Sequence, residues 1–170
     1  MHAYVRDVMT TSVVAVRPDT AYREMTVMFR THRVSGFPVV DHDGKVTGVV
    51  SETDLLAVAA ADPDPAAQPA PRGWRPHHKQ LTVGEATAGA LMTHPAVTIG
   101  PDELVRTAAR LMSSLKLQQL PVVDRDGHLV GIISRSDVLS VFRRSDEEIH
   151  REVTQDVIAD GFFTDRPGSR

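Results

Sequence analysis

The chain lacks cysteine and is poor in aromatic residues, which make up 5% of its 170 residues. The absence of cysteine excludes disulfide bonds, thiol catalysis and thiolate metal sites. The formal net charge of −3 leaves no basic surplus, so we expect no nucleic acid partner. With 41% hydrophobic and 24% charged residues, the composition is typical of a soluble globular protein.

Long apolar runs are also missing. The longest uncharged apolar stretch, residues 55–61, is far shorter than a membrane-spanning helix. The opening residues MHAYVRDVM contain no long apolar core and no cleavage-like site, so export is not expected. These observations predict a cytoplasmic protein without a transmembrane segment.

Patterns that indicate catalysis or metal binding are missing as well. The sequence has no Gly-x-Gly-x-x-Gly motif and no phosphate-loop motif. Adjacent side chains such as His77 and His78 do not face one another on a regular element, and no carboxylate cluster lies near them in the sequence. Other histidines have no evident Ser or Asp partner for nucleophilic catalysis. We therefore predict neither an enzyme nor a metal site.

An internal duplication is the clearest feature that is present. Two halves align without a gap at an offset of 83 residues, with about a third of the positions from 9 to 56 identical. The matching segments include Met9-Thr10 with Met92-Thr93, Pro38–Asp41 with Pro121–Asp124, Gly48 with Gly131, Ser51 with Ser134, and Asp54 with Asp137.

Each copy has the same succession of predicted elements. Short apolar runs at 13–16 and 96–99 indicate strands, and apolar residues at helical spacing follow, with Asp19 and Asp102 as expected N-caps. Two further apolar runs split by Asp-Gly indicate a hairpin, after which Ser51 or Ser134 begins another helix. A short helix is expected before each copy, at 4–9 and 83–92.

One such unit is too small to close a core by itself. We expect the two copies to pack sheet against sheet and to bury their strands jointly, which gives an α+β fold. The predicted divisions are a first motif at 1–60, a connector at 61–80, a second motif at 81–144 and a C-terminal helix and tail at 145–170. Five prolines favour a semi-rigid connector.

These motifs, in this order and in both copies, resemble the CBS motif, so residues 1–144 resemble a tandem CBS pair, or Bateman module. The resemblance implies two β-α-β-β-α motifs related by pseudo-two-fold symmetry, with two clefts between them. It implies binding of AMP, ADP, ATP or S-adenosylmethionine, no required cofactor, a homodimer, and regulation of an attached domain or partner rather than catalysis. The alternative is a purely structural dimerisation or interaction module with empty clefts.

Asp54 and Asp137 are the principal candidate ligand residues. A carboxylate can accept hydrogen bonds from both hydroxyls of a ribose diol. Ser51 and Ser134 precede them at a helix N-terminus, where unpaired N–H groups and the helix dipole favour phosphate. The resemblance implies the same roles. The same Ser-x-x-Asp pattern is also a variant capping box, and capping by Ser can coexist with ligand binding by Asp.

The two copies differ at the two positions between the shared serine and the shared aspartate. Glu52 and Thr53 in the first correspond to Arg135 and Ser136 in the second. If these side chains line the clefts, Arg135 attracts phosphate and Glu52 repels it, so the clefts are unequal. The alternative is that they are solvated charges on an exposed helical turn.

The turn before each hairpin is a secondary candidate for contact with adenine. The resemblance implies that backbone groups of this turn meet the base, with an apolar neighbour against the ring. The residues concerned are Gly36, Phe37, Pro38, Gln119, Leu120 and Pro121. Alternatively, they are simply strand entries with Phe37 and Leu120 in the core.

Residues 145–170 lie beyond the duplication. Ser145 to Glu148 form a capping-box pattern, and apolar residues at helical spacing follow. The segment SDEEIHREVTQDVIAD resembles the opening helix of a BON domain, a small module associated with phospholipid binding. Either a longer native protein completes that domain, giving a membrane or partner contact, or the helix serves packing or dimerisation.

Overall fold

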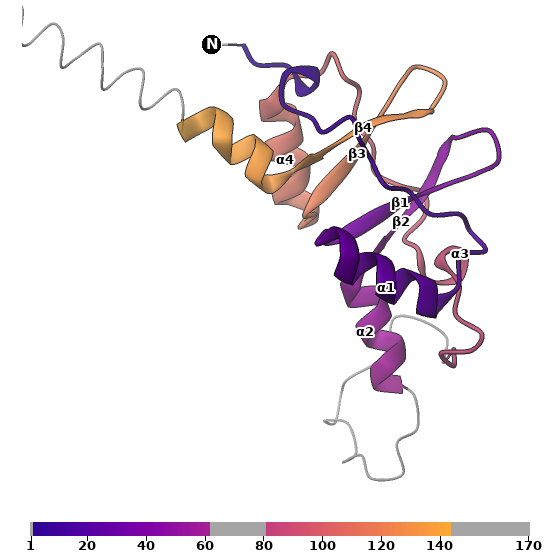
Figure 1. Ribbon diagram of the computed structural model, residues 1–170. Helices are drawn as coiled ribbons and strands as arrows, with labels where there is room; N and C mark the ends of the chain where they lie inside the picture. Colours follow the sequence, from indigo (N-terminus) through magenta and orange to yellow (C-terminus); the bar gives the residue numbers. More distant parts are fainter. Residues whose placement is uncertain (1, 62–80, 144–170) are drawn as a thin grey trace, which may run out of the picture.

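The computed structural model describes residues 2–61 and 81–143 (Figure 1). The first repeat contains α1 (Tyr22–His32), β1 (Gly36–Val40), β2 (Val46–Ser51) and α2 (Glu52–Ala61). The second contains α4 (Val105–Leu115), β3 (Gln119–Val123), β4 (Leu129–Ser134) and a helix over 135–143, and the short helix α3 (Ala88–Leu91) lies before it. The predicted mixture of helices and small antiparallel sheets is confirmed. Most of the Pro-rich connector and the C-terminal segment with its BON-like pattern lie outside the described residues.

The two long helices α1 and α4 end in the same way but do not begin as predicted. Each is followed by a left-handed residue, Arg33 with φ 52° and Lys116 with φ 55°. The N-cap positions are Ala21 and Leu104, without a side-chain hydrogen bond, so the prediction of Asp19 and Asp102 as N-caps was wrong. The carboxylate of Asp102 instead accepts a hydrogen bond from the Arg6 guanidinium.

The hairpins β1–β2 and β3–β4 are antiparallel and share one register. Gly36 pairs with Ser51 in the first, and Gln119 pairs with Ser134 in the second. The predicted Asp-Gly turns are present, with positive φ values of 80° at Gly44 and 87° at Gly127. These turns make the two strands of each hairpin antiparallel neighbours.

A carboxylate holds each hairpin turn closed. Asp41 Oδ1 accepts the backbone N–H groups of Asp43 and Lys45, both at 2.9 Å. Asp124 Oδ1 does the same for Asp126 and His128, also at 2.9 Å. The bond from the Lys45 N–H lowers the pKa of Asp41, and that from the His128 N–H lowers the pKa of Asp124.

This pKa shift predicts a pH-dependent effect of the turn carboxylates. A lowered pKa in the folded state means stabilisation that is present above the unfolded pKa and lost as pH falls through the folded pKa. We expect Asp124→Ala to lower the melting temperature slightly at pH 7, and the difference from the unmodified chain to shrink towards pH 2. Thermal denaturation across this pH range measures it. A difference that is constant with pH would contradict this explanation.

The first predicted strand of each repeat is reduced to a single parallel bridge. Val16 bridges Val39, and Ile99 bridges Val122. Pro18 and Pro101, two residues further on, have no N–H to extend the ladder. The expected short helices are also shorter than predicted: a 3-10 turn, η1 (Val5–Asp7), precedes the first repeat, and α3 precedes the second.

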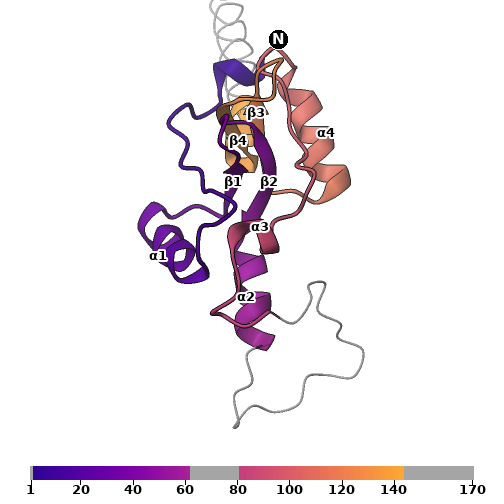
Figure 2. The ribbon, with the colours of Figure 1, turned by 90° about the vertical axis from the view of Figure 1, so that its right-hand side faces the viewer.

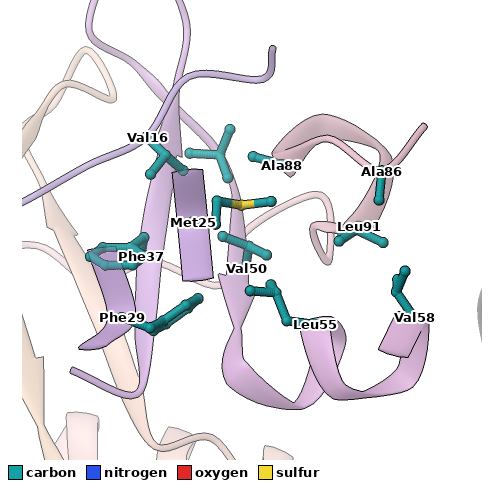
Figure 3. Close-up of a cluster of buried hydrophobic side chains, with 11 residues drawn as sticks. Val16, Met25, Phe29, Phe37, Val50, Leu55, Val58, Ala86, Ala88 and Leu91 are labelled. Carbon is teal, nitrogen blue, oxygen red and sulfur yellow. The ribbon is translucent and has the colours of Figure 1, made fainter. Parts of the chain in front are cut away.

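The hydrophobic interior is divided into two clusters, where the sequence predicted one joint core. The first cluster contains Phe37 and Val50 of the β1–β2 hairpin and also Ala86, Ala88 and Leu91, which precede the second repeat (Figure 3). The second cluster contains the β3–β4 hairpin and α4, with Val5 from the N-terminal turn. The helical turn before each repeat therefore completes the core of the other.

Backbone pairing also connects each hairpin to the other repeat. Thr93 bridges Val49 of β2, and Thr10 bridges Ile132 of β4, so each hairpin gains an antiparallel neighbour from the other repeat. The glycine next to each bridge allows this approach. A Cβ on Gly48 would lie 2.5 Å from Met92 Sδ, and one on Gly131 would lie 2.6 Å from Met9 Sδ.

The two repeats therefore form one body. Both hairpins lie in the middle of the molecule, with α1 and α4 on opposite sides (Figure 2). The hairpin turns meet through a bridge between Lys45 and His128, with hydrogen bonds from Val46 N to Gly127 O and from Leu129 N to Gly44 O. Among the described residues, no helix is long and apolar enough to span a bilayer. Residues of both repeats therefore meet near the first residues of β1 and β3.

Candidate ligand clefts

Two cavities lie between the repeats, where α2 and the helix over 135–143 begin. Cleft 1 has a volume of about 440 Å³ and is lined by Ser35, Val49, Ser51, Glu52, Thr53, Asp54, Thr93, Val97, Lys116, Leu117, Gln118 and Gln119. Cleft 2 has a volume of about 580 Å³ and is lined by Thr10, Ser12, Val13, Val14, His32, Arg33, Val34, Ser35, Gly36, Phe37, Gln119, Ile132, Ser134, Ser136 and Asp137.

The clefts are counterparts under the 83-residue offset, and each draws on both repeats. Cleft 1 combines the start of α2 with the loop after α4, whereas cleft 2 combines the start of the last described helix with the loop after α1. Lys116 and Arg33 occupy equivalent positions in these loops. The left-handed conformation that ends α1 and α4 turns the chain into the cleft wall.

The predicted capping box is present in both repeats. Ser51 donates to Asp54 Oδ2 through its N–H at 2.8 Å and its hydroxyl at 2.9 Å, and the Asp54 N–H donates to Ser51 Oγ at 3.4 Å. The corresponding distances between Ser134 and Asp137 are 2.8, 2.7 and 3.4 Å. The capping interpretation is therefore confirmed for both serines and both aspartates.

Capping still leaves acceptor capacity on Asp137. An ionised carboxylate has about four lone-pair positions. Oδ2 uses two of them for the N–H and the hydroxyl of Ser134. Among the described residues, no hydrogen bond to Asp137 Oδ1 occurs, so this oxygen can accept the hydroxyls of a ligand in cleft 2.

The four residues that distinguish the helix starts do not all line a cleft. Glu52 and Thr53 line cleft 1, and Ser136 lines cleft 2, with its Oγ 2.8 Å from Ser134 Oγ. Arg135 lines neither cleft. Arg135 is exposed and its Nε donates to the carbonyl of Leu117 at 2.9 Å, so the alternative of an exposed charge on the first helical turn describes it better.

Arg135 thus supports the loop that forms a wall of cleft 1. Its backbone N–H also donates to Gln118 O at 3.1 Å, so two hydrogen bonds join it to residues 117 and 118. We expect Arg135→Ala to remove the side-chain bond and to cost about 1 kcal/mol of stability. Hydrogen exchange at the Leu117 and Gln118 amides should increase, while exchange in the loop over 33–35 should not. Equal changes in both loops would contradict this role.

The charges of the two clefts differ. The residues that line cleft 1 include two acidic ones, Glu52 and Asp54, and one basic one, Lys116. Those that line cleft 2 include one acidic residue, Asp137, together with Arg33 and His32. Cleft 2 has one acidic residue where cleft 1 has two. The positive charge of Arg33 is therefore less compensated, and cleft 2 is the more favourable environment for an anion.

The candidate adenine-contacting residues separate into two groups. Gly36 and Phe37 line cleft 2, and Gln119 lines both clefts. Pro38, Leu120 and Pro121 are almost completely buried and line neither cleft.

The sequence did not predict the cleft residues that come from the opposite repeat, chiefly Arg33 and Lys116. Their signal was a basic residue at the same position in both copies, directly after a predicted helix.

One group of potential metal ligands lies outside the clefts. The Asp124, Asp126 and His128 side chains offer ligand atoms within 4.8 Å of one another at the hairpin turn. Asp124 already accepts two backbone N–H groups there, and its Oδ2 lies 3.3 Å from His128 Nδ1. These contacts account for the group as part of the turn.

Comparison with known proteins agrees with this architecture. The CBS domain family matches residues 5–61 and 88–144. CBSX1, a chloroplastic CBS domain-containing protein of Arabidopsis thaliana, is 32% identical over 133 residues, covering 73% of this chain and 56% of its own length. The chain thus spans little more than half of that relative.

Two solved structures resemble the fold. CBSX2 of Arabidopsis thaliana in complex with AMP superposes with a TM-score of 0.67 at 27% identity, covering 85% of this chain and 98% of its own. The cytosolic domain of the Mg²⁺ channel MgtE in complex with ATP gives a TM-score of 0.58 at 29% identity, covering 79% and 46%. Two family matches over most of the described residues, two repeats that exchange their N-terminal turns, and two clefts between them show that the chain is a tandem pair of the CBS domain family.

Proposed function

We propose that this CBS pair binds adenine nucleotides in the clefts between its repeats. The observation that carries the proposal is that each cleft joins a capped helix N-terminus with its Asp from one repeat to a basic loop of the other. A nucleotide needs these two kinds of contact at once, since its ribose offers hydroxyl donors and its phosphate carries negative charge.

Cleft 2 is proposed to bind nucleotides more tightly. Asp137 Oδ1 accepts the ribose hydroxyls, and the Arg33 guanidinium pairs with the phosphate near Ser134 and Ser136. Phe37 and Gly36 form the apolar and backbone surface against which the base lies. Cleft 1 has the equivalent parts in Asp54, Ser51, Thr53 and Lys116, but Glu52 repels the phosphate.

The structurally similar CBS pairs support adenine as the base. CBSX2 was crystallised with AMP, and the MgtE cytosolic domain was crystallised with ATP. For this chain we therefore propose AMP, ADP or ATP as ligands, with S-adenosylmethionine as a further compound that carries the same adenosine group. The ligand acts as a signal and is not a required cofactor.

The proposed role of binding is regulation without catalysis. A ligand in either cleft contacts both repeats, so its binding free energy favours the relative position of the repeats that closes on it. An attached domain or a partner that distinguishes these positions would respond to nucleotide concentration.

Thermal denaturation with added ligand tests the proposed function. A ligand that binds only the folded chain at 100 times its dissociation constant stabilises it by about 2.7 kcal/mol. For a chain of this size that corresponds to a rise of roughly 5–10 °C in the melting temperature. The panel comprises AMP, ADP, ATP, S-adenosylmethionine and NADH. No rise with any of them at millimolar concentration would contradict nucleotide binding.

An interaction module that dimerises is the second candidate, and one observation favours it. Leu56 on α2 is 67% exposed, and its counterpart Leu139 is 61% exposed. All residues of α2 after Asp54 are apolar, which is unusual for a helix facing solvent. We therefore propose a homodimer that covers these leucines, which is compatible with nucleotide binding.

The dimer is tested by Leu56→Glu combined with Leu139→Glu. Charges placed in an apolar interface are expected to shift the chain from dimer to monomer in sedimentation equilibrium, because an unpaired buried charge is unfavourable. Val27→Glu, at another exposed apolar position, serves as the control. A dimer that withstands the double change, or an unmodified chain that is monomeric at all concentrations, would contradict this interface.

A further inference from the structure

Gln119 occupies a position that belongs to both clefts. It lines cleft 1 together with Gln118, and it lines cleft 2 together with Gly36. Ser35 is the other residue that lines both, and its side chain is too short to reach far into either. The wall between the two clefts therefore contains one long polar side chain.

Only one repeat can supply a side chain at this place. Gln119 and Gly36 are equivalent under the 83-residue offset, and each opens the first strand of its hairpin. A Cβ added to Gly36 would lie 2.5 Å from Gln119 Nε2. The carboxamide of Gln119 thus fills the space that the missing side chain of Gly36 leaves, and the pseudo-two-fold symmetry is broken where the clefts meet.

The carboxamide is available to a ligand. Among residues 2–61 and 81–143, no hydrogen bond holds its Oε1 or Nε2, and the residue is only partly buried. A glutamine amide offers two donors and an acceptor, which match the polar edge of a purine base or a ribose hydroxyl. Its terminal torsions can turn it towards cleft 1 or cleft 2, but not towards both at once.

We propose that Gln119 is a shared ligand-binding residue that couples the two clefts negatively. The inference rests on the proposed nucleotide binding. A nucleotide in one cleft recruits the carboxamide, so a nucleotide entering the other cleft binds without that hydrogen bond. The coupling is reciprocal, because each ligand must weaken the other by the same factor. One lost hydrogen bond corresponds to a factor of about three to ten in affinity.

Site-resolved titration of the full chain with AMP measures this coupling. The Thr53 amide reports on cleft 1 and the Ser136 amide reports on cleft 2, by nuclear magnetic resonance. The AMP affinity of cleft 1 is compared between the unmodified chain and Asp137→Ala, which weakens cleft 2. We expect cleft 1 to bind AMP about three- to tenfold more tightly when cleft 2 is weakened, and this gain to disappear when Gln119→Met is added.

Two further variants, compared with Gln119→Met, make the result specific. Gln119→Met keeps the length of the side chain without its amide, and Gln119→Gly reproduces the residue at the equivalent position, so failure of one to fold leaves the other. Gln118→Gly, which alters cleft 1 alone, should keep the coupling. An AMP affinity of cleft 1 that is the same in the unmodified chain and in Asp137→Ala, or coupling that persists in Gln119→Met, would overturn the inference and leave the proposed function intact. No shift at either amide with AMP, ADP, ATP or S-adenosylmethionine would overturn both.

Discussion

Leu91→Ala is expected to lower the free energy of unfolding by about 3 kcal/mol, the cost of removing a large aliphatic side chain from a packed core. Leu91 precedes the second repeat in the sequence, yet it is fully buried in the core of the first repeat, among residues of the β1–β2 hairpin and α2 (Figure 3). The cavity would therefore form within the cluster of buried residues that also contains Val50 and Leu55. Chemical denaturation followed by circular dichroism measures the loss.

The location of the loss is the sharper test. In Leu91→Ala, native-state hydrogen exchange should increase first in β1 and β2, and later or less in β3 and β4. Leu115→Ala is the matched control, because this leucine is 50% exposed at the end of α4 and should cost little. Hydrogen exchange that increases only in β3 and β4 would contradict the packing of each N-terminal turn in the core of the other repeat.

Asp137→Ala is expected to weaken AMP binding in cleft 2 by about 10- to 100-fold. Hydrogen bonds to a charged group contribute about 1.5–3 kcal/mol, and each 1.4 kcal/mol corresponds to a factor of ten. The physical reason is that Oδ1 of this carboxylate is the acceptor proposed for the ribose hydroxyls. Isothermal titration calorimetry on the folded chain measures the change.

Asp137 also caps a helix, so a control must separate the two roles. Ser134→Ala removes the hydroxyl that donates to Asp137 Oδ2 at 2.7 Å and leaves the carboxylate in place. Loss of the cap costs about 1 kcal/mol of stability in either variant. We expect Ser134→Ala to change AMP affinity by less than about fivefold, in line with one neutral hydrogen bond. Equal losses of affinity in the two variants would indicate that Asp137 acts through the helix cap alone.

The sequence was sufficient to predict the local elements of this fold. The duplication, the two long helices and the Asp-Gly hairpins all depend on residues close together in the chain. The capping box is another local feature, and both copies have it. Asp19 and Asp102 were wrong as caps because the helices begin two residues later, and the Asp102 carboxylate bonds to Arg6.

The packing of segments that lie far apart in the chain was harder to predict from the sequence. An alignment of the two copies shows which residues are equivalent, but not which copy a segment packs against. The turn containing Val5 packs in the core of the second repeat, and the turn containing Leu91 packs in the core of the first. For the same reason the sequence left open whether Arg135 lines a cleft or lies exposed, and it did not predict the hydrogen bond from this side chain to Leu117.

The glycine spacing is a feature whose meaning became clear only in three dimensions. Gly48 and Gly131 first contributed to the family resemblance as letters in a repeated motif. In the structure, each lies against the backbone of the other repeat, with Thr93 O and Thr10 O at 2.8 and 3.0 Å from an added Cβ. These two positions therefore require glycine because the backbone of the other repeat lies close to them. The sequence pattern alone does not show this contact.

Mapping AMP-induced amide shifts over the whole chain tests the central claim most directly, because the claim is that each ligand site is shared by two repeats. We predict that the largest shifts at low AMP occur together at Ser134 to Asp137 of the second repeat and at Thr10, Val14 and Arg33 of the first. Shifts confined to one repeat, or no shifts at millimolar AMP, would contradict it.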